Sequence, residues 1–161
     1  MGDAYRELGQ PADSRRILEE GLARTFETEE ENDPAQLARA AVRSELGYTA
    51  MAEGRFAEAE ALFSTALNEY DSGPAVSRWD RLRPRGRVIS GLGRALAGQG
   101  KFVQAEPLVI AEFSELKANG EIFFGDRTRM LHAALDAIVQ VYRAAGKPDQ
   151  AAEWERKRAE L

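Results

Sequence analysis

Apolar residues recur every three or four positions along most of the chain, which is the period of an amphipathic α-helix. In residues 56–70 this pattern places small and large apolar side chains on one side of a helix and charged side chains on the other. No run of strict alternation between apolar and polar residues predicts a β-strand. The pattern therefore predicts an all-α fold.

A glycine-containing turn separates the predicted helices and recurs at nearly constant spacing. Gly9, Gly54, Gly100 and Gly146 lie 45, 46 and 46 residues apart. Glycine adopts the left-handed conformation that ends a helix and reverses the chain, so each turn predicts an antiparallel helix pair. A fixed period is the signature of a repeat architecture. We expect one repeat domain over residues 1–161, with helix pairs at 1–26, 34–70, 75–118 and 126–160 and the first pair truncated.

Three prolines refine the helix boundaries. Asp33 and Pro34 predict an N-cap and a first-turn proline at the start of the second pair. Pro84 and Gly86 fall within the helix expected at 75–97, so we expect a kink or break there. Pro107 should lie in the first turn of its helix, expected at 102–118. The other expected helices are 1–8, 12–26, 34–53, 56–70, 126–145 and 148–160.

Small and large residues hold fixed places within each pair. In the second pair they are Gly47, Ala50, Gly54, Ala59, Phe63 and Ala66. In the third pair they are Gly93, Leu96, Gly100, Ala105 and Val109, with Glu112 where alanine stood. The fourth pair departs from the pattern at Glu155 and Arg158. This arrangement resembles the tetratricopeptide repeat family, in the longer-period form found in kinesin light chains. The resemblance implies a right-handed superhelix of antiparallel helix pairs.

A narrower resemblance concerns residues 98–108 and 141–154. These segments are similar to the C-terminal repeat array of bacterial serine/threonine protein kinases of the planctomycete type. The kinase's glycine-rich loop with its lysine, its catalytic loop and its metal-binding Asp-Phe-Gly are not in the sequence. The resemblance implies a regulatory or substrate-docking array whose catalytic domain is absent from this chain.

Composition limits the classes of function. The net charge of −5 has the wrong sign for a dedicated nucleic-acid binder. No apolar run is long enough to span a membrane, and the first residues do not resemble a secretory signal, so we expect a cytoplasmic location. Cysteine is absent and His132 is the only histidine, so we expect no catalytic site, no metal and no cofactor. The sequence predicts a non-enzymatic protein.

Two features offer catalytic or nucleic-acid chemistry, and each has a plainer interpretation. His132 lies one turn before Asp136, but without a nucleophile nearby we favour a packing or surface histidine over a general base. Five arginines lie within residues 78–87, together with Trp79, and could bind phosphate or a stacked base. We favour a solvated helix face with Trp79 in the core.

Two predicted loops offer binding chemistry. The acidic residues within 27–33 lack the spacing of a calcium loop, so we favour a solvated loop over a cation site. Phe123 and Phe124 either fold back over the last helix pair or belong to a partner-binding surface, and we favour packing.

The family resemblance implies that the first helices line a concave face that binds a peptide. The residues of these helices expected on that face are Arg6, Ser44, Tyr48, Met51, Arg87, Ser90, Arg94, Asp136, Gln140 and Arg143. The lysines and asparagines of the family's two-carboxylate clamp are not reproduced here. Because Arg87, Arg94 and Arg143 share this register, we expect an acidic peptide or a C-terminal carboxylate as the ligand. The alternative, in which these arginines pair with neighbouring acids such as Asp136, stays open.

Three hypotheses of function follow. The first is a protein-interaction module that binds a peptide or protein partner on its concave face. The second is the accessory array of a kinase. The third is self-association, because an array that is cut at its ends exposes apolar helix faces there.

Overall fold

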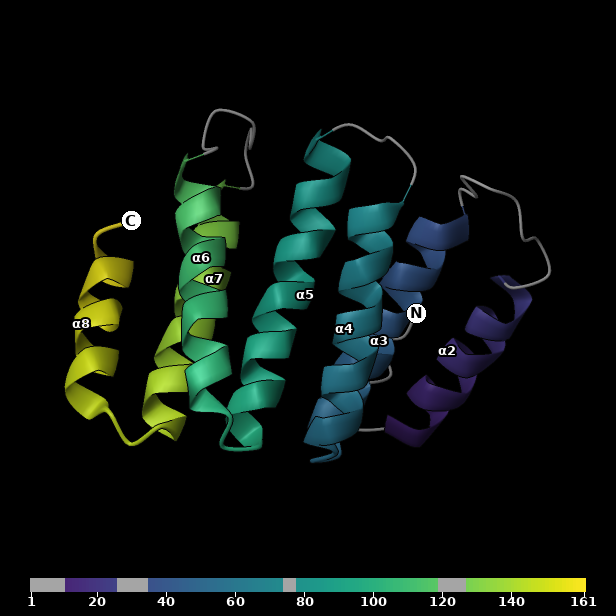
Figure 1. Ribbon diagram of the computed structural model, residues 1–161, viewed down its shortest axis with the longest axis horizontal. Helices are drawn as coiled ribbons and strands as arrows, with labels where there is room; N and C mark the ends of the chain where they lie inside the picture. Colours follow the sequence, from purple (N-terminus) through teal and green to yellow (C-terminus); the bar gives the residue numbers. More distant parts are fainter. Residues whose placement is uncertain (1–10, 26–34, 74–77, 119–126) are drawn as a thin grey trace. The chain divides into compact units, whose positions relative to one another are not determined.

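The computed structural model describes residues 11–25, 35–73, 78–118 and 127–161, and every regular element in them is an α-helix. The helices are α2 (Pro11–Thr25), α3 (Ala35–Ala52), α4 (Phe56–Ser72), α5 (Arg78–Gly98), α6 (Phe102–Ala118), α7 (Arg127–Ala144) and α8 (Pro148–Ala159). Figure 1 shows them as a succession of helices. The predicted all-α fold is confirmed, and the described helices begin and end close to their expected limits.

The chain divides into two compact units, Met1–Val76 and Ser77–Leu161. In the first unit, α3 packs against both α2 and α4. In the second unit, α5 packs against α6 and α7, α6 packs against α7, and α7 packs against α8. The expected first helix at 1–8, and with it Gly9, lies outside the described residues. The expectation of one domain over residues 1–161 stays a prediction.

The three described glycine turns have the same backbone structure. Gly54, Gly100 and Gly146 have φ angles of 74°, 74° and 68°, in the left-handed region where side chains other than glycine are strained. At the first turn the N–H of Gly54 donates to the carbonyl of Met51 (3.0 Å), and the N–H of Arg55 donates to that of Ala50 (2.8 Å). The same two bonds recur at the other two turns. These bonds form the Schellman motif, which satisfies the carbonyls at the end of the first helix and turns the chain into the second.

Glycines at the helix crossings let the paired helices approach closely. A Cβ atom added to Gly47 would lie 2.8 Å from the ring of Phe63, and one added to Gly93 would overlap Cγ1 of Val109. Phe63 and Val109 are almost completely buried. A small residue in the first helix therefore receives a large residue from the second helix at the same place in both pairs.

The structure corrects the expectations at the two internal prolines. Of the kink or break expected at Pro84, the break is wrong, because α5 runs without interruption from Arg78 to Gly98, and the kink stays a prediction. The second half of α5 is buried, and this packing keeps the helix formed despite the missing hydrogen bond. The first-turn place expected for Pro107 is also wrong, because Pro107 is the sixth residue of α6. It is exposed, as is Val103 four residues earlier, so the carbonyl of Val103 loses its helical donor on the solvent side of the helix.

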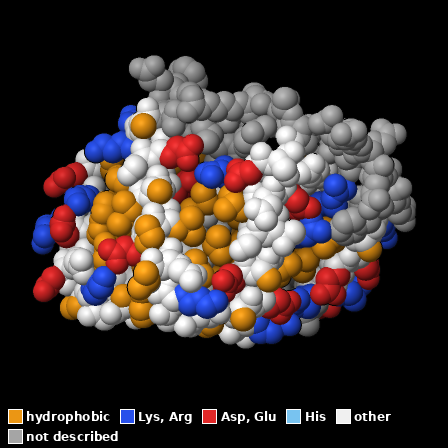
Figure 2. All heavy atoms as spheres, in the orientation of Figure 1, with side chains coloured by type: hydrophobic (Ala, Val, Ile, Leu, Met, Phe, Trp, Pro, Cys, Tyr) orange, Lys and Arg blue, Asp and Glu red, His pale blue; other side chains and the backbone are white. Residues whose placement is uncertain are grey.

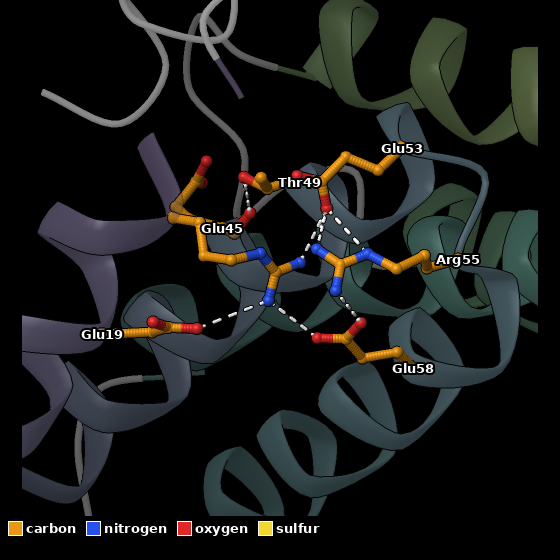
Figure 3. Close-up of polar contacts among 7 residues, drawn as sticks. Glu19, Glu45, Thr49, Glu53, Arg55 and Glu58 are labelled. Carbon is orange, nitrogen blue, oxygen red and sulfur yellow. Dashed lines mark hydrogen bonds and ion pairs between the residues drawn. The ribbon is translucent and has the colours of Figure 1, made fainter. Parts of the chain in front are cut away.

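An ion-pair network ties α2 to the turn between α3 and α4. The guanidinium of Arg15 donates to Glu53 and to Glu58, each at 2.8 Å. Arg55 bonds the same two carboxylates, as Figure 3 shows. Burial alone would raise the pKa of Glu53, but the hydrogen bonds from Arg55 and Arg15 lower it below its usual value. The network therefore holds three helices of the first unit together through one turn.

Candidate interaction surface

In the first unit the candidate residues lie on α3, and they differ in exposure. Ser44 is buried, at 5% exposed, whereas Tyr48 and Met51 are partly exposed. The ring of Tyr48 packs edge-on against that of Phe63, with the centroids 5.0 Å apart. Tyr48 and Met51 are therefore accessible to a partner, while the Ser44 hydroxyl is covered. Arg6 lies outside the described residues.

In the second unit α5 presents three of the candidate residues. Arg87 is exposed, and Ser90 and Arg94 are partly exposed. Arg87 and Arg94 lie seven residues apart, which places them on one side of the helix. The side chain of Arg94 makes no hydrogen bond or ion pair with any residue that the structure describes. Its guanidinium is therefore available to a carboxylate.

The candidate residues of α7 are largely engaged by α8. Arg143 donates a hydrogen bond to Glu155, and Arg158 forms an ion pair with Asp136, with 3.0 Å between Nε and Oδ1. Gln140 is exposed. Within the predicted basic register, the charge of Arg143 is therefore neutralised by Glu155, and the basic face on α5 stays a prediction. The alternative interpretation is correct for that arginine, although its acid is Glu155 and not Asp136.

Within the arginine-rich segment, the side chains of residues 78–83 lie outside the described part, and Trp79 is among them. Arg85 lies 3.3 Å from Glu115 and 3.7 Å from Glu112, both on α6. This arginine therefore joins α5 to α6, in agreement with a structural interpretation rather than a phosphate site.

Glu112 is a buried carboxylate at a position where the sequence departs from the repeat pattern. It is 4% exposed and lies against Gly86, where an added Cβ atom would overlap the carboxylate. Burial and the nearby charge of Glu115 raise its pKa to about 7, against the opposing effect of the Arg85 charge. Two features of the sequence indicate this buried carboxylate: an acidic residue at a repeat position where alanine is usual, and a glycine, Gly86, in the preceding helix.

The remaining candidates add no reactive site. His132 is partly buried on α7. In the described ranges no three acidic or histidine side chains come together in a way that could hold a metal ion. None of the helices that the structure describes is long and apolar enough to cross a membrane. The acidic segment 27–33 and the pair Phe123 and Phe124 lie outside the described residues.

A comparison with protein families finds a match for two of the helix pairs. The tetratricopeptide repeat model matches residues 40–64 and 87–109. The first segment covers most of α3 and half of α4, and the second covers half of α5 and part of α6. These two segments are therefore similar to tetratricopeptide repeats. Each compact unit thus contains one matched repeat, and each match spans a Schellman turn and a glycine at the helix crossing. Tetratricopeptide repeats generally mediate contacts between proteins.

Two solved structures of tetratricopeptide-like repeats are similar to this chain. Both come from Podosopora anserina and are described as nearly identical repeats of a putative kinesin light chain. The alignments cover 98% of this chain and 89% and 90% of those chains, at 17% and 16% sequence identity and a TM-score of 0.42 in each case. A search among curated proteins finds no match.

Proposed function

We propose that this protein is a non-enzymatic interaction module that binds a protein or peptide segment rich in carboxylates. The first helices of its repeats form the binding face, and in the second unit α5 supplies the cationic contact. The observation that carries the proposal is Arg94. It is a partly exposed arginine in the matched repeat, on the same side of α5 as Arg87, and no described acid engages it.

The chemistry of the face favours an acidic ligand. A guanidinium binds a carboxylate through two parallel hydrogen bonds, which gives orientation as well as attraction. α5 packs against α7, whose exposed Gln140 adds a neutral donor and acceptor to the first-helix side of the second unit. In the first unit, Tyr48 and Met51 offer apolar contacts to a partner. Within the second unit, a segment that carries carboxylates matches Arg94 and Gln140.

A binding assay tests this proposal through matched arginine substitutions. Peptides of equal length, one acidic and one neutral, are titrated into the protein at low salt, where charge attraction is strongest. Arg94→Ala should weaken binding of the acidic peptide by about tenfold, because a charged hydrogen bond contributes roughly 1.5–3 kcal/mol. Arg16→Ala, at an exposed arginine of α2 that pairs with Glu20, should leave binding unchanged. Equal binding of the acidic and neutral peptides would refute the proposal.

We further propose that the chain performs no chemistry of its own. The single histidine has no acidic or histidine cluster around it in the described part of the chain, and no enzyme family matches the sequence. Turnover of nucleotide by the purified protein would contradict this, provided that a point substitution in this chain abolishes it.

The resemblance to the repeat array of bacterial serine/threonine kinases leads to a second hypothesis, in which the same binding face docks a substrate of the kinase. It stays a prediction about the parent protein. The sequence encoded upstream of this segment tests it: a kinase domain there would support it, and a different domain would exclude it.

A further inference from the structure

One side of α6 faces solvent over about four turns of the helix, and its residues carry no charge. The residues on this side, here called the α6 stripe, are Val103, Pro107, Ile110, Ala111, Ser114 and Ala118. Ile110 is partly exposed and the others are exposed, Val103 by 90%. In Figure 2 hydrophobic side chains follow the course of α6 in the left half of the view. A contiguous apolar side of this kind indicates a surface that contacts a partner.

The acidic residues of α6 lie off this stripe and are engaged within their own unit. Glu106 accepts a hydrogen bond from Lys147 at 2.9 Å. Glu115 lies 3.3 Å from Arg85, and Glu112 is buried. The exposed sides of α2 and α8, in contrast, carry ion pairs. A partner can therefore cover the α6 stripe without removing a charge from water.

The polar groups of the stripe are placed at its two ends. The hydroxyl of Ser114 donates to the carbonyl of Ile110 (2.9 Å), so it is satisfied within the helix. Because Pro107 has no N–H, the carbonyl of Val103 near the start of α6 has no helical donor. Lys117 near the end is exposed and makes no hydrogen bond or ion pair with any residue that the structure describes. An acceptor at one end thus accompanies a donor at the other.

The order of side-chain sizes makes the stripe complementary to itself. Its larger residues lie in the first half of α6 and its smaller residues in the second half. In an antiparallel pair of α6 helices, with a two-fold axis between residues 110 and 111, Val103 lies level with Ala118 of the second copy. Pro107 lies level with Ser114 of that copy, and Ala111 meets its own equivalent beside the axis. Such a contact, in which one surface pairs with itself, is the commonest kind in symmetric dimers.

The same arrangement brings the two polar ends together. Lys117 of the second copy lies beside Val103, where its ammonium can donate to the carbonyl that Pro107 leaves without a donor. Size, charge and hydrogen bonding therefore all fit a second α6 in the opposite direction.

The stripe is particular to α6 and is not a general feature of the second helices. The corresponding exposed residues of α4 are Ala57, Ala61, Thr65 and Asn68, none of which is a large apolar residue. The chain of α4 also contains no proline, so no carbonyl in its middle lacks a donor.

We propose that the α6 stripe is a docking surface for a second copy of this chain, in which two α6 helices pack antiparallel about a two-fold axis beside Ala111. A single helix pair is small beside the roughly 1,600 Å² of a standard interface, so the dimer dissociates on dilution. This inference does not depend on the acidic ligand.

The experiment places opposite charges beside the axis. The mass of each protein is measured by light scattering over a series of concentrations, and we expect the mass of the parent to rise toward that of two chains. Ala111→Glu and Ala111→Lys should each weaken association at least tenfold, because like charges then meet across the axis. An equimolar mixture of the two variants should associate again, since a carboxylate then faces an ammonium.

The matched control is Ala61→Glu, which places the same charge on the corresponding exposed side of α4 and should associate like the parent. Circular dichroism checks the helix content, which glutamate and lysine should preserve at an exposed helical position.

Cross-linking supplies a second measurement, because the chain has no cysteine. Under mild oxidation Ala111→Cys should form a disulfide between two copies at least ten times faster than Ala61→Cys, since only residues near the axis come close enough. The proposal is overturned if the parent has the mass of one chain up to about 1 mM. It is equally overturned if both Ala111 charge variants associate like the parent, if their mixture associates no better than either alone, or if the two cysteine variants cross-link at the same rate.

Discussion

Single residues define the turns and crossings of this array, and glycine does so for two different reasons. Gly54 has a positive φ, and a Cβ atom added there would meet nothing within 4 Å, so only its backbone conformation demands glycine. Gly93 lies in a helix and is required because Val109 occupies the space of a side chain. The sequence identified both kinds through their fixed spacing, but only the structure separates the two causes.

The turn glycine gives a stability prediction. Gly54→Val should lower the free energy of unfolding by about 1–2 kcal/mol, because a β-branched residue resists the left-handed conformation. Gly21→Ala is the matched control, since Gly21 lies within α2 and a Cβ atom there meets nothing within 4 Å. That change should leave stability unchanged or raise it by up to roughly 1 kcal/mol. Denaturant unfolding measures both, and an unaltered midpoint for Gly54→Val would contradict the assigned turn.

Glu112 gives a prediction of pH dependence. Its pKa is about 7 in the folded chain and 4.5 as the ordinary value, so the folded state binds the extra proton between these pH values. Stability should therefore fall as pH rises from about 4.5 to 8, by an amount on the order of 3 kcal/mol at most. Glu53 and Glu106 have lowered pKa values and act in the opposite direction, but at lower pH.

Glu112→Gln tests this dependence directly. The amide keeps the shape of the side chain and removes its titration, so the variant should be more stable than the parent at pH 8 and should lose the decline with pH. Glu20→Gln, at an exposed carboxylate of α2, serves as control and should retain it. Equal slopes for the parent and Glu112→Gln, from thermal unfolding at several pH values, would show that Glu112 is not the group responsible.

At the scale of elements, hydrophobic periodicity predicted the limits of the described helices well. The positions of two prolines led to wrong expectations about α5 and α6. Periodicity works because each helix buries one side against its partner. A kink or break was expected at Pro84 and a first-turn position for Pro107, yet α5 is unbroken and Pro107 is the sixth residue of α6. The reason lies in tertiary packing. Burial of one side of α5 compensates for the hydrogen bond lost at Pro84, and exposure of Pro107 leaves the freed carbonyl accessible to water. A local stretch of sequence reveals neither the burial nor the exposure.

The Arg15 network predicts how α2 is held. Arg15→Ala removes charged hydrogen bonds to Glu53 and Glu58 from partly buried groups, so amide hydrogen exchange in α2 should quicken more than exchange in α4. Arg16→Ala removes an exposed pair with Glu20 and should change exchange little. Uniform slowing or no change in α2 for Arg15→Ala would contradict this role.

At the scale of the whole molecule, the sequence predicted the repeat architecture but only part of the candidate face. The register of the first helices follows from the period, so the places of Arg87, Arg94 and Gln140 could be predicted. The sequence could not predict which arginine is free to bind a ligand. Glu155, which pairs with Arg143, lies on a different helix, and no local pattern indicates that contact. The burial of Ser44 likewise depends on neighbouring helices.

The central claim is that the first-helix side of the repeats binds an acidic partner. Nuclear magnetic resonance of the labelled protein, titrated with an acidic peptide, tests it most directly because it reports the site as well as the binding. We predict shift changes that concentrate on residues 87–94 of α5 and around Gln140 of α7, and that fade when Arg94 is replaced by alanine. Changes confined to α6 and α8, or none at all at low salt, would contradict the account.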